Sequence, residues 1–269
     1  MNHLVYRAMS RQELRPAGRC TTLRPTRARP EVAKKSPRRP TTALDQATLL
    51  STVDQSRLAP NLLARLSAST RSEVLRLGRR REYCTGDLLF RQGDSHDGIF
   101  LIESGVVKSF YVSEDGKALT LGYWTAGHYV GAPQMFGGGE HAWTSIAAAP
   151  AVCLWLPGAE LRKLCERCND LTLALIDVLV HKTQCYCAVL QLLATHSMRV
   201  RLARLLVMLS AANHERTVRL SHGELASMIG STRQWVSLCL AHLQEEGLVT
   251  GSRAGAFKVA DPSALLKVR

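Results

Sequence analysis

The sequence predicts an α+β protein built of three parts in chain order. Short apolar runs separated by glycine turns between residues 83 and 156 indicate a β-roll or barrel. A stretch without proline or glycine after residue 170 indicates one long helix, and two short apolar-periodic segments between 221 and 245 indicate a packed helical pair. The 269 residues, 46% of them hydrophobic, allow one large or two ordinary domains.

The N-terminal segment differs from the rest of the chain in charge. Residues 1–44 hold eleven Arg and Lys against two Glu, so they carry +9 of the formal net charge of +13. Five prolines and few apolar residues predict a disordered basic tail, because little surface can be buried to offset the cost of ordering. Three interpretations stay open: a basic arm with non-specific nucleic-acid affinity, a transit peptide, and a gene model that begins upstream of the true start near Leu44.

Residues 45–168 are predicted to form the β-roll. Two amphipathic helices are expected first, at 45–53 and 62–77. Strands then follow at a spacing of about ten residues, which is typical of a β-roll with tight turns. The expected strands cover residues 99–102, 106–112, 119–124, 142–149 and 151–156, with a hairpin turn at 114–117.

Residues 169–196 are predicted to form a dimerisation helix. Two apolar stripes run along it, so it needs two neighbours: its own β-roll, and the same helix of a second subunit as in a coiled coil. A helix buried within one domain is the alternative. Lys182 in the first stripe would cost stability and would set the register of the coiled coil. The first stripe is a heptad seam of Leu171, Leu175, Val178, Lys182, Cys185, Val189 and Leu192, and the second contains Ile176, Leu179, Tyr186, Leu190 and Leu193.

Residues 197–269 are predicted to contain a winged helix-turn-helix. Ala226 is small where two helices touch, Gly230 suits the tight turn four residues later, and Val236 packs the second helix back on the first. An ordinary helical hairpin is the alternative, but these three offsets favour the unit that lays its second helix in the major groove of DNA. The other apolar positions are Leu225, Met228, Ile229, Cys239, Leu240 and Leu243.

The exposed face of the second helix is predicted to contact base edges. Arg233 and Gln234 lie near its N-terminus, with Ser237 and Leu238 one turn later. Arg suits guanine and Gln suits adenine, whereas a leucine can only touch a thymine methyl group. Phosphate contacts, which position a protein without specifying sequence, are expected from His222, Thr232 and Lys258.

Composition narrows the class of protein. The pI near 9.8 fits a partner with negative charge. No run of eighteen apolar residues and no signal-peptide core are present, so we expect a cytoplasmic protein without a membrane partner. The sequence shows no nucleophile–base pair, no glycine-rich phosphate loop and no dense metal cluster, so we do not expect an enzyme.

The order of these parts resembles the cyclic-AMP receptor protein and Fnr (Crp/Fnr) superfamily of bacterial transcription regulators, over about residues 45–260. Besides the helix-turn-helix, the specific elements are the Gly-Asp turns at 86–87 and 93–94, the strand–turn at 100–105 and the hairpin at 115–116. The resemblance implies a cyclic-nucleotide-binding-like β-roll and a homodimer through the long helix. It also implies RNA polymerase as a partner and double-stranded DNA with inverted-repeat half-sites about 34 Å apart.

The resemblance fails where it would identify the effector. Members that bind cyclic nucleotides have Glu after the glycine matched by Gly131, and an Arg-Ser or Arg-Thr pair about ten residues later. Here Ala132 replaces the Glu and Ala142-Trp143 replaces the pair, so no cation would meet the phosphate. We therefore expect an effector other than cyclic AMP, or none. The predicted effector pocket consists of Gly131, Ala132, Ala142, Trp143, Tyr186 and Cys187.

The cysteines leave a second kind of control open. Cys165 and Cys168 have metal-ligand spacing, and Cys185 and Cys187 follow about five helical turns later. A redox- or metal-responsive regulator is therefore an alternative, although the pattern does not match the iron–sulfur cysteines of Fnr-type sensors.

Two further alternatives concern haem and loss of function. His128 and His141 flank the predicted pocket and are a haem alternative, yet no cofactor and no metal site are predicted. A ligand-binding scaffold with a vestigial DNA-binding domain is the other; the polar side chains of Arg233, Gln234 and Ser237 count against it.

Overall fold

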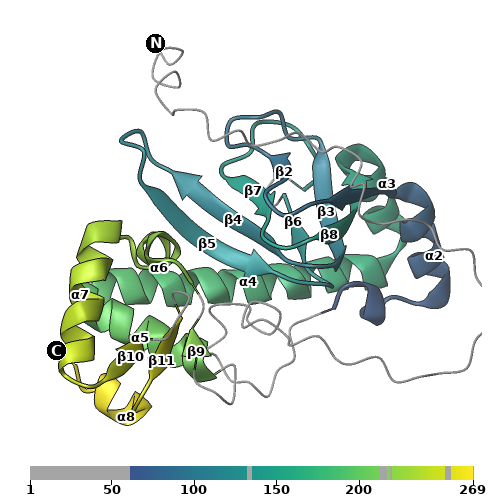
Figure 1. Cartoon of the computed structure of the whole chain (residues 1–269). Helices are drawn as coiled ribbons and strands as arrows, with labels where there is room; N and C mark the ends of the chain where they lie inside the picture. The colour runs from purple at the N-terminus through teal and green to yellow at the C-terminus, as the bar shows by residue number, and fades with distance from the viewer. Residues whose placement is uncertain (1–60, 132–134, 212–216, 219, 252–255, 269) are drawn as a thin grey trace, which may run out of the picture.

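The computed structural model describes residues 61–131, 135–211, 217–218, 220–251 and 256–268. It is an α+β structure, as predicted: two four-stranded sheets form a β-roll, a long helix crosses beneath them, and a helical domain with a three-stranded sheet follows (Figure 1). The basic tail and the helix expected at 45–53 lie outside the described residues.

The β-roll consists of two antiparallel sheets that enclose a core. One sheet has the order β1-β8-β3-β6 and the other β2-β7-β4-β5. All five strands expected between residues 99 and 156 are present, and the strand at 142–149 is shortened to four residues. The strands are β1 (Arg79–Tyr83), β2 (Leu88–Phe90), β3 (Gly98–Ser104), β4 (Val107–Val112), β5 (Ala118–Trp124), β6 (Tyr129–Val130), β7 (Thr144–Ala147) and β8 (Ala151–Pro157).

Tight turns close the roll where glycine is required. Gly105, between β3 and β4, has φ of +85°, and a Cβ there would lie 2.1 Å from the carbonyl oxygen of Pro150. Gly131, after β6, has φ of +108°, and a Cβ would lie 2.9 Å from the carbonyl oxygen of Gly98. Both positions therefore exclude a side chain by conformation and by space.

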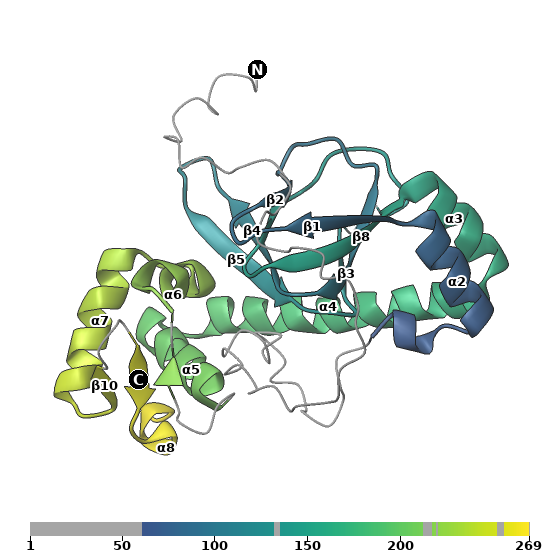
Figure 2. The ribbon, with the colours of Figure 1, turned by 45° about the vertical axis from the view of Figure 1, so that its right-hand side comes forward.

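Short helices close one end of the roll. The helix expected at 62–77 is divided into a 3-10 turn, η2 (Leu63–Arg65), and helix α2 (Ala68–Leu77), because Ser67 caps α2 and breaks the helical path. Helix α3 (Gly158–Arg167) follows β8 and was not predicted. Figures 1 and 2 show α2 and α3 side by side at the end of the roll away from the C-terminal domain.

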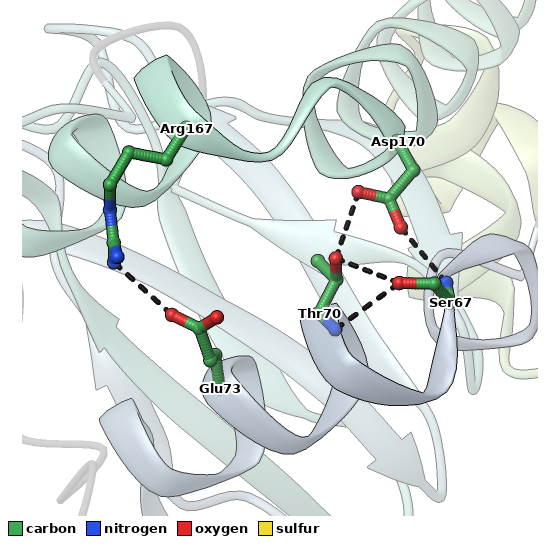
Figure 3. A network of polar contacts seen from close by, with 5 residues as sticks. All are labelled: Ser67, Thr70, Glu73, Arg167 and Asp170. Carbon is green, nitrogen blue, oxygen red and sulfur yellow. Dashed lines mark hydrogen bonds and ion pairs between the residues drawn. The ribbon is translucent and has the colours of Figure 1, made fainter.

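A polar network joins α2 to the start of the long helix α4 (Asn169–Thr195) (Figure 3). The Asp170 carboxylate accepts the backbone N–H of Ser67 at 2.9 Å and the hydroxyl of Thr70 at 3.0 Å. These donors, the Ser67 amide first, hold the pKa of Asp170 below its usual value. Arg167 donates to Glu73 at 3.1 Å beside it. The network fixes where α4 leaves the roll.

Helix α4 has two apolar faces, but their roles differ from the prediction. Leu175, Val178 and Val189 of the predicted seam are buried within the chain, and Lys182 with them. The first two lie in one core cluster with β3 and β8 residues. A different stripe is exposed, with Leu173, Ile176, Val180 and Leu190 each between 49% and 66% accessible. The seam expected to meet a second subunit is therefore the face that meets the β-roll.

Helix α4 is also long and apolar enough, by length and composition, to cross a membrane. The sequence-based expectation relied on an uninterrupted apolar run, and α4 contains Asp177, His181 and Lys182 within its apolar stretch. A helix with one face in a core and another face available to a partner has the same composition.

The C-terminal domain begins with α5 (Met198–Ala211), which was not predicted. Its sheet has the order β10-β11-β9, and β10 and β11 form the wing. The helix-turn-helix lies between β9 and β10. The remaining elements are β9 (Thr217–Val218), α6 (His222–Ile229), α7 (Arg233–Glu245), β10 (Val249–Gly251), β11 (Phe257–Val259) and α8 (Pro262–Leu265).

Candidate DNA-binding surface and effector pocket

A side-chain cap defines the start of each helix in the α6–turn–α7 unit. Ser221 accepts the backbone N–H of Glu224 at 3.2 Å, while the Glu224 carboxylate accepts the Ser221 N–H at 2.8 Å, forming a capping box. Gly230 ends α6 with φ of +66°. Thr232 caps α7 by accepting the N–H of Trp235 at 3.2 Å. The turn is therefore set by local sequence, and the Thr232 hydroxyl expected to meet phosphate is the helix cap.

The predicted core of the helix-turn-helix is present. Ala226 and Val236 are buried at the contact between α6 and α7, at 4% and 0% exposure. Ala226 is the small residue at the helix contact, Gly230 has the positive φ of the turn, and Val236 is buried where α7 packs back on α6. The unit is therefore not the ordinary helical hairpin of the alternative interpretation. The other predicted apolar positions, Leu225, Met228, Ile229, Cys239, Leu240 and Leu243, are all buried in the same cluster.

The outer face of α7 is exposed in the part of the chain that the structure describes. Arg233 and Gln234 are exposed at its first turn, and Leu238 is 64% exposed one turn later. Lys258 is exposed on wing strand β11. A guanidinium, an amide and an apolar tip therefore project from one helix beside a basic wing, which is the chemistry that base edges and phosphates require.

His222 and Ser237 make protein contacts as well as bordering this face. His222 Nδ1 lies 2.6 Å from the Ser237 hydroxyl, and the Ser237 hydroxyl donates to the Arg233 carbonyl at 2.9 Å. The His222 ring also lies 5.4 Å from the Phe257 ring of the wing, centroid to centroid. His222 thus links α6, α7 and β11, so a predicted phosphate contact is also a brace between the recognition helix and the wing.

Arg201, which sequence reasoning missed, ties α4 to the DNA-binding domain. Its guanidinium donates to the carbonyls of Leu193 at 2.5 Å, His196 at 2.9 Å and Ile229 at 3.2 Å. These carbonyls belong to the end of α4, the α4–α5 connection and the end of α6. One cation therefore satisfies C-terminal carbonyls of two helices and fixes α6 relative to α4.

A direct contact between β-roll and helix-turn-helix was also missed. The Thr120 hydroxyl of β5 lies 2.8 Å from the Ser227 hydroxyl of α6, and both groups are buried. Tyr123 belongs to the same buried cluster as the helix-turn-helix core. Burial lowers the pKa of Lys108 on β4, an effect that Glu224 of α6 opposes. No single residue type signals such a contact, because it joins segments a hundred residues apart.

Two of the six predicted effector residues, Trp143 and Tyr186, are in contact with each other. Their ring centroids lie 6.3 Å apart, and Tyr186 also packs edge-on against Trp124 at 5.9 Å. Gly131 lies against β3, as described above. Ala142 and Cys187 are exposed, and Ala132 lies outside the described residues.

Lys182 lies under this aromatic cluster and is 2% exposed. Its ammonium donates to the Tyr129 carbonyl at 2.6 Å and lies 3.8 Å from the centroid of the Trp124 ring. Burial lowers the pKa of Lys182 to about 7. In the sequence, Lys182 was a single cation in an apolar stripe, and we interpreted it as part of a subunit interface. In the structure it faces the interior of the β-roll instead.

The two histidines of the haem alternative lie in different surroundings. His128 is fully buried next to Trp124 and His181, and burial, followed by Lys182, lowers its pKa to about 3. His141 instead stacks on Phe90, with centroids 3.8 Å apart. Among the described residues, no group of three His, Cys, Asp or Glu side chains is placed to hold a metal ion.

The Cys165 and Cys168 pair lies at the α3–α4 junction. Cys165 is half-buried within α3 and Cys168 lies between the two helices. Burial raises the pKa of Cys165, so little of it is thiolate near neutral pH. Burial also raises the pKa of Cys185 to about 11. Cys165 and Cys185 are therefore in the environment of structural rather than reactive cysteines.

Comparison with protein families finds two domain models in this chain. A cyclic nucleotide-binding domain matches residues 80–168, and a Crp-like helix-turn-helix domain matches residues 200–268. Together they cover the β-roll and the C-terminal domain, on either side of α4.

Comparison with individual proteins agrees with these two domain models. The chain is 29% identical over 170 residues to the cyclic AMP receptor protein of Thermus thermophilus (63% of this chain, 79% of the relative). It is 26% identical over 201 residues to the transcriptional activator protein Anr of Pseudomonas protegens (72% and 80%). The c-di-GMP responsive global regulator CLP of Xanthomonas campestris shares the fold, with a TM-score of 0.67 at 22% identity (72% and 100%). The chain therefore belongs to the Crp/Fnr superfamily of bacterial transcription regulators.

Proposed function

We propose that this protein is a homodimeric, DNA-binding regulator of transcription that acts in the cytoplasm on inverted-repeat sites. The observation that carries the proposal is the outer face of α7, where Arg233, Gln234 and Leu238 are exposed on a helix that is capped, packed and braced from behind. The helix backbone is held in place before DNA binds, so binding does not have to order it. No catalytic role is proposed.

The exposed stripe of α4 supports the proposed dimer. Leu173, Ile176, Val180 and Leu190 are large apolar side chains about half exposed along one helix face. A stripe of this kind is stabilised by a second helix, and a two-fold dimer would present two α7 helices to two half-sites. We expect RNA polymerase to be the further partner, since family regulators act at promoters.

The effector is proposed to be a molecule other than cyclic AMP. Ala142 replaces the family's arginine and presents no charge for a phosphate. The Lys182 ammonium is the nearby buried cation, and its contacts are the Tyr129 carbonyl and the Trp124 ring. Burying a cyclic phosphate without a free cation would be costly.

Substitution of Arg233 tests the DNA-binding proposal. Arg233→Ala should cost about 1–3 kcal/mol of binding to the selected operator and relax the preference at one base pair per half-site. Fluorescence anisotropy on operator and random duplexes measures both. Arg71→Ala, which removes an exposed arginine from α2, is the matched control for net charge. Equal loss on both duplexes would mean that Arg233 contacts only phosphate.

A further inference from the structure

The exposed stripe of α4 continues in strict heptad spacing past its large apolar members. Exposed residues occur at 173, 176, 180, 183, 187, 190 and 194, which are steps of three and four residues in alternation. Leu173, Val180 and Cys187 therefore occupy a positions, and Ile176, Thr183 and Leu190 occupy d positions. Cys187 is thus a member of the seam, one turn before Leu190, and not an isolated surface thiol.

In a two-fold coiled coil, a seam of this kind brings the same residue of each copy together. If α4 pairs with α4 of a second copy in parallel around a two-fold axis, each a residue packs beside the same residue of the partner. That geometry places the Cys187 thiol next to the partner's Cys187, near the distances that a disulfide needs without backbone movement.

We propose that Cys187 and the partner's Cys187 form a reversible disulfide that locks the dimer, with a low-molecular-weight disulfide such as oxidised glutathione as the oxidant. The inference rests on the proposed dimerisation through α4. It deepens that proposal by naming the residue through which thiol redox state would control assembly.

The reaction balances as two thiol–disulfide exchanges. The Cys187 thiolate of a dissociated chain, where the residue is exposed, attacks oxidised glutathione, forms a mixed disulfide and releases one glutathione thiolate. After association, the partner's Cys187 thiolate attacks the mixed disulfide on its Cys187 sulfur. The second glutathione thiolate leaves, and the two protons lost by the cysteines are taken up by the two glutathione thiolates.

The neighbouring cysteine cannot substitute for Cys187. Cys185 is 2% exposed on the opposite face, where burial raises the pKa of its thiol to about 11. Its Sγ lies 3.8 Å from Nε2 of His181 inside the chain. Cys185 is therefore an inert thiol under the β-roll, whereas Cys187 is an accessible thiol on the seam.

The experiment is non-reducing electrophoresis of the full chain after incubation with oxidised glutathione. We expect most of the protein to run as a covalent dimer, dithiothreitol to reverse it, and Cys187→Ser to abolish it. In the Cys187→Ser background, Thr183→Cys at the preceding d position should restore the cross-link. Gln184→Cys should not, because residues at e face residues at g, and the two copies of e lie on opposite sides of the axis.

Sedimentation of the reduced protein separates failure of this inference from failure of the dimer. A reduced dimer in which Cys187 does not cross-link while Thr183→Cys does would overturn the disulfide and leave the dimer standing. A reduced protein that is monomeric would overturn both. A cross-link that persists in Cys187→Ser would assign it to another cysteine and contradict the inference.

Discussion

The two faces of α4 are both apolar, and they are used in opposite ways. The face with Leu175 and Val178 is buried against the β-roll, whereas the face with Ile176 and Leu190 is open along its length. The inner face also contains a buried cation, Lys182, while the outer face has none among its seam residues. Hydrophobicity therefore shows that a helix has two neighbours, and only packing shows which neighbour each face meets.

The largest effect is expected from charging the outer face. Ile176→Glu combined with Leu190→Glu should produce a monomer with unchanged secondary structure, because both side chains are already exposed in the single chain. Losing the second half-site should weaken operator binding by about 10²–10⁴-fold, the usual gain from linked binding. Sedimentation and anisotropy measure the two effects. A double variant that keeps the dimer mass would move the interface to another surface.

Truncating a side chain on the inner face should lower stability and leave the dimer intact. Leu175→Ala removes a side chain that is 3% exposed within the β-roll core, and should lower the free energy of unfolding by about 2–5 kcal/mol. The dimer mass of the folded protein should not change. Denaturant titration measures the stability. Leu173→Ala on the outer face is the matched leucine control. Loss of the dimer in Leu175→Ala alone would reverse the assignment of the two faces.

Lys182 makes the contribution of the inner face to stability depend on pH. The folded pKa of about 7 lies below the ordinary value of 10.5, so above pH 7 the unfolded chain holds a proton that the folded chain has released. The contribution of Lys182 to stability should therefore rise with pH between about 7 and 8.5, before ordinary thiols titrate. In Lys182→Met the slope of unfolding free energy against pH should be smaller across this window. Parallel slopes would mean that Lys182 stays protonated in the folded chain.

The smallest expected effect is that of cyclic AMP. Calorimetry with cyclic AMP or cyclic GMP should give no heat of binding at micromolar concentrations, since Ala142-Trp143 stands where the family's arginine pair would meet the phosphate. Neither nucleotide should alter the operator affinity of the dimer. A micromolar dissociation constant for either would show that another group near Trp143 and Tyr186 holds the phosphate.

The fold and the helix-turn-helix could be predicted because their signals are local. Ala226, Gly230 and Val236 lie within eleven residues of one another, and each has a steric reason for its position. The Gly-Asp turns of the β-roll are equally local. By contrast, α3 and α5 were missed, and the helix at 62–77 was predicted as one piece because the cap at Ser67 went unrecognised.

The effector region could not be predicted in the same way because it is assembled from distant segments. Tyr186 and Cys187 are adjacent in sequence, yet one packs against Trp143 and the other lies on the outer face. A rotation of 100° per residue is enough to separate them, and sequence alone does not fix where that rotation begins. The contacts of Arg201 and Thr120 are likewise invisible until α6 is placed against α4 and β5.

Selection of duplexes from a random pool by the full-length reduced protein tests the central claim most directly. The account predicts enrichment of an inverted repeat with half-sites one helical turn apart, about 34 Å or 10 base pairs between centres. Ile176→Glu combined with Leu190→Glu should lose that enrichment while keeping its fold. Enrichment of a single half-site, of a direct repeat, or of no sequence at all would contradict a dimeric regulator that reads DNA through α7.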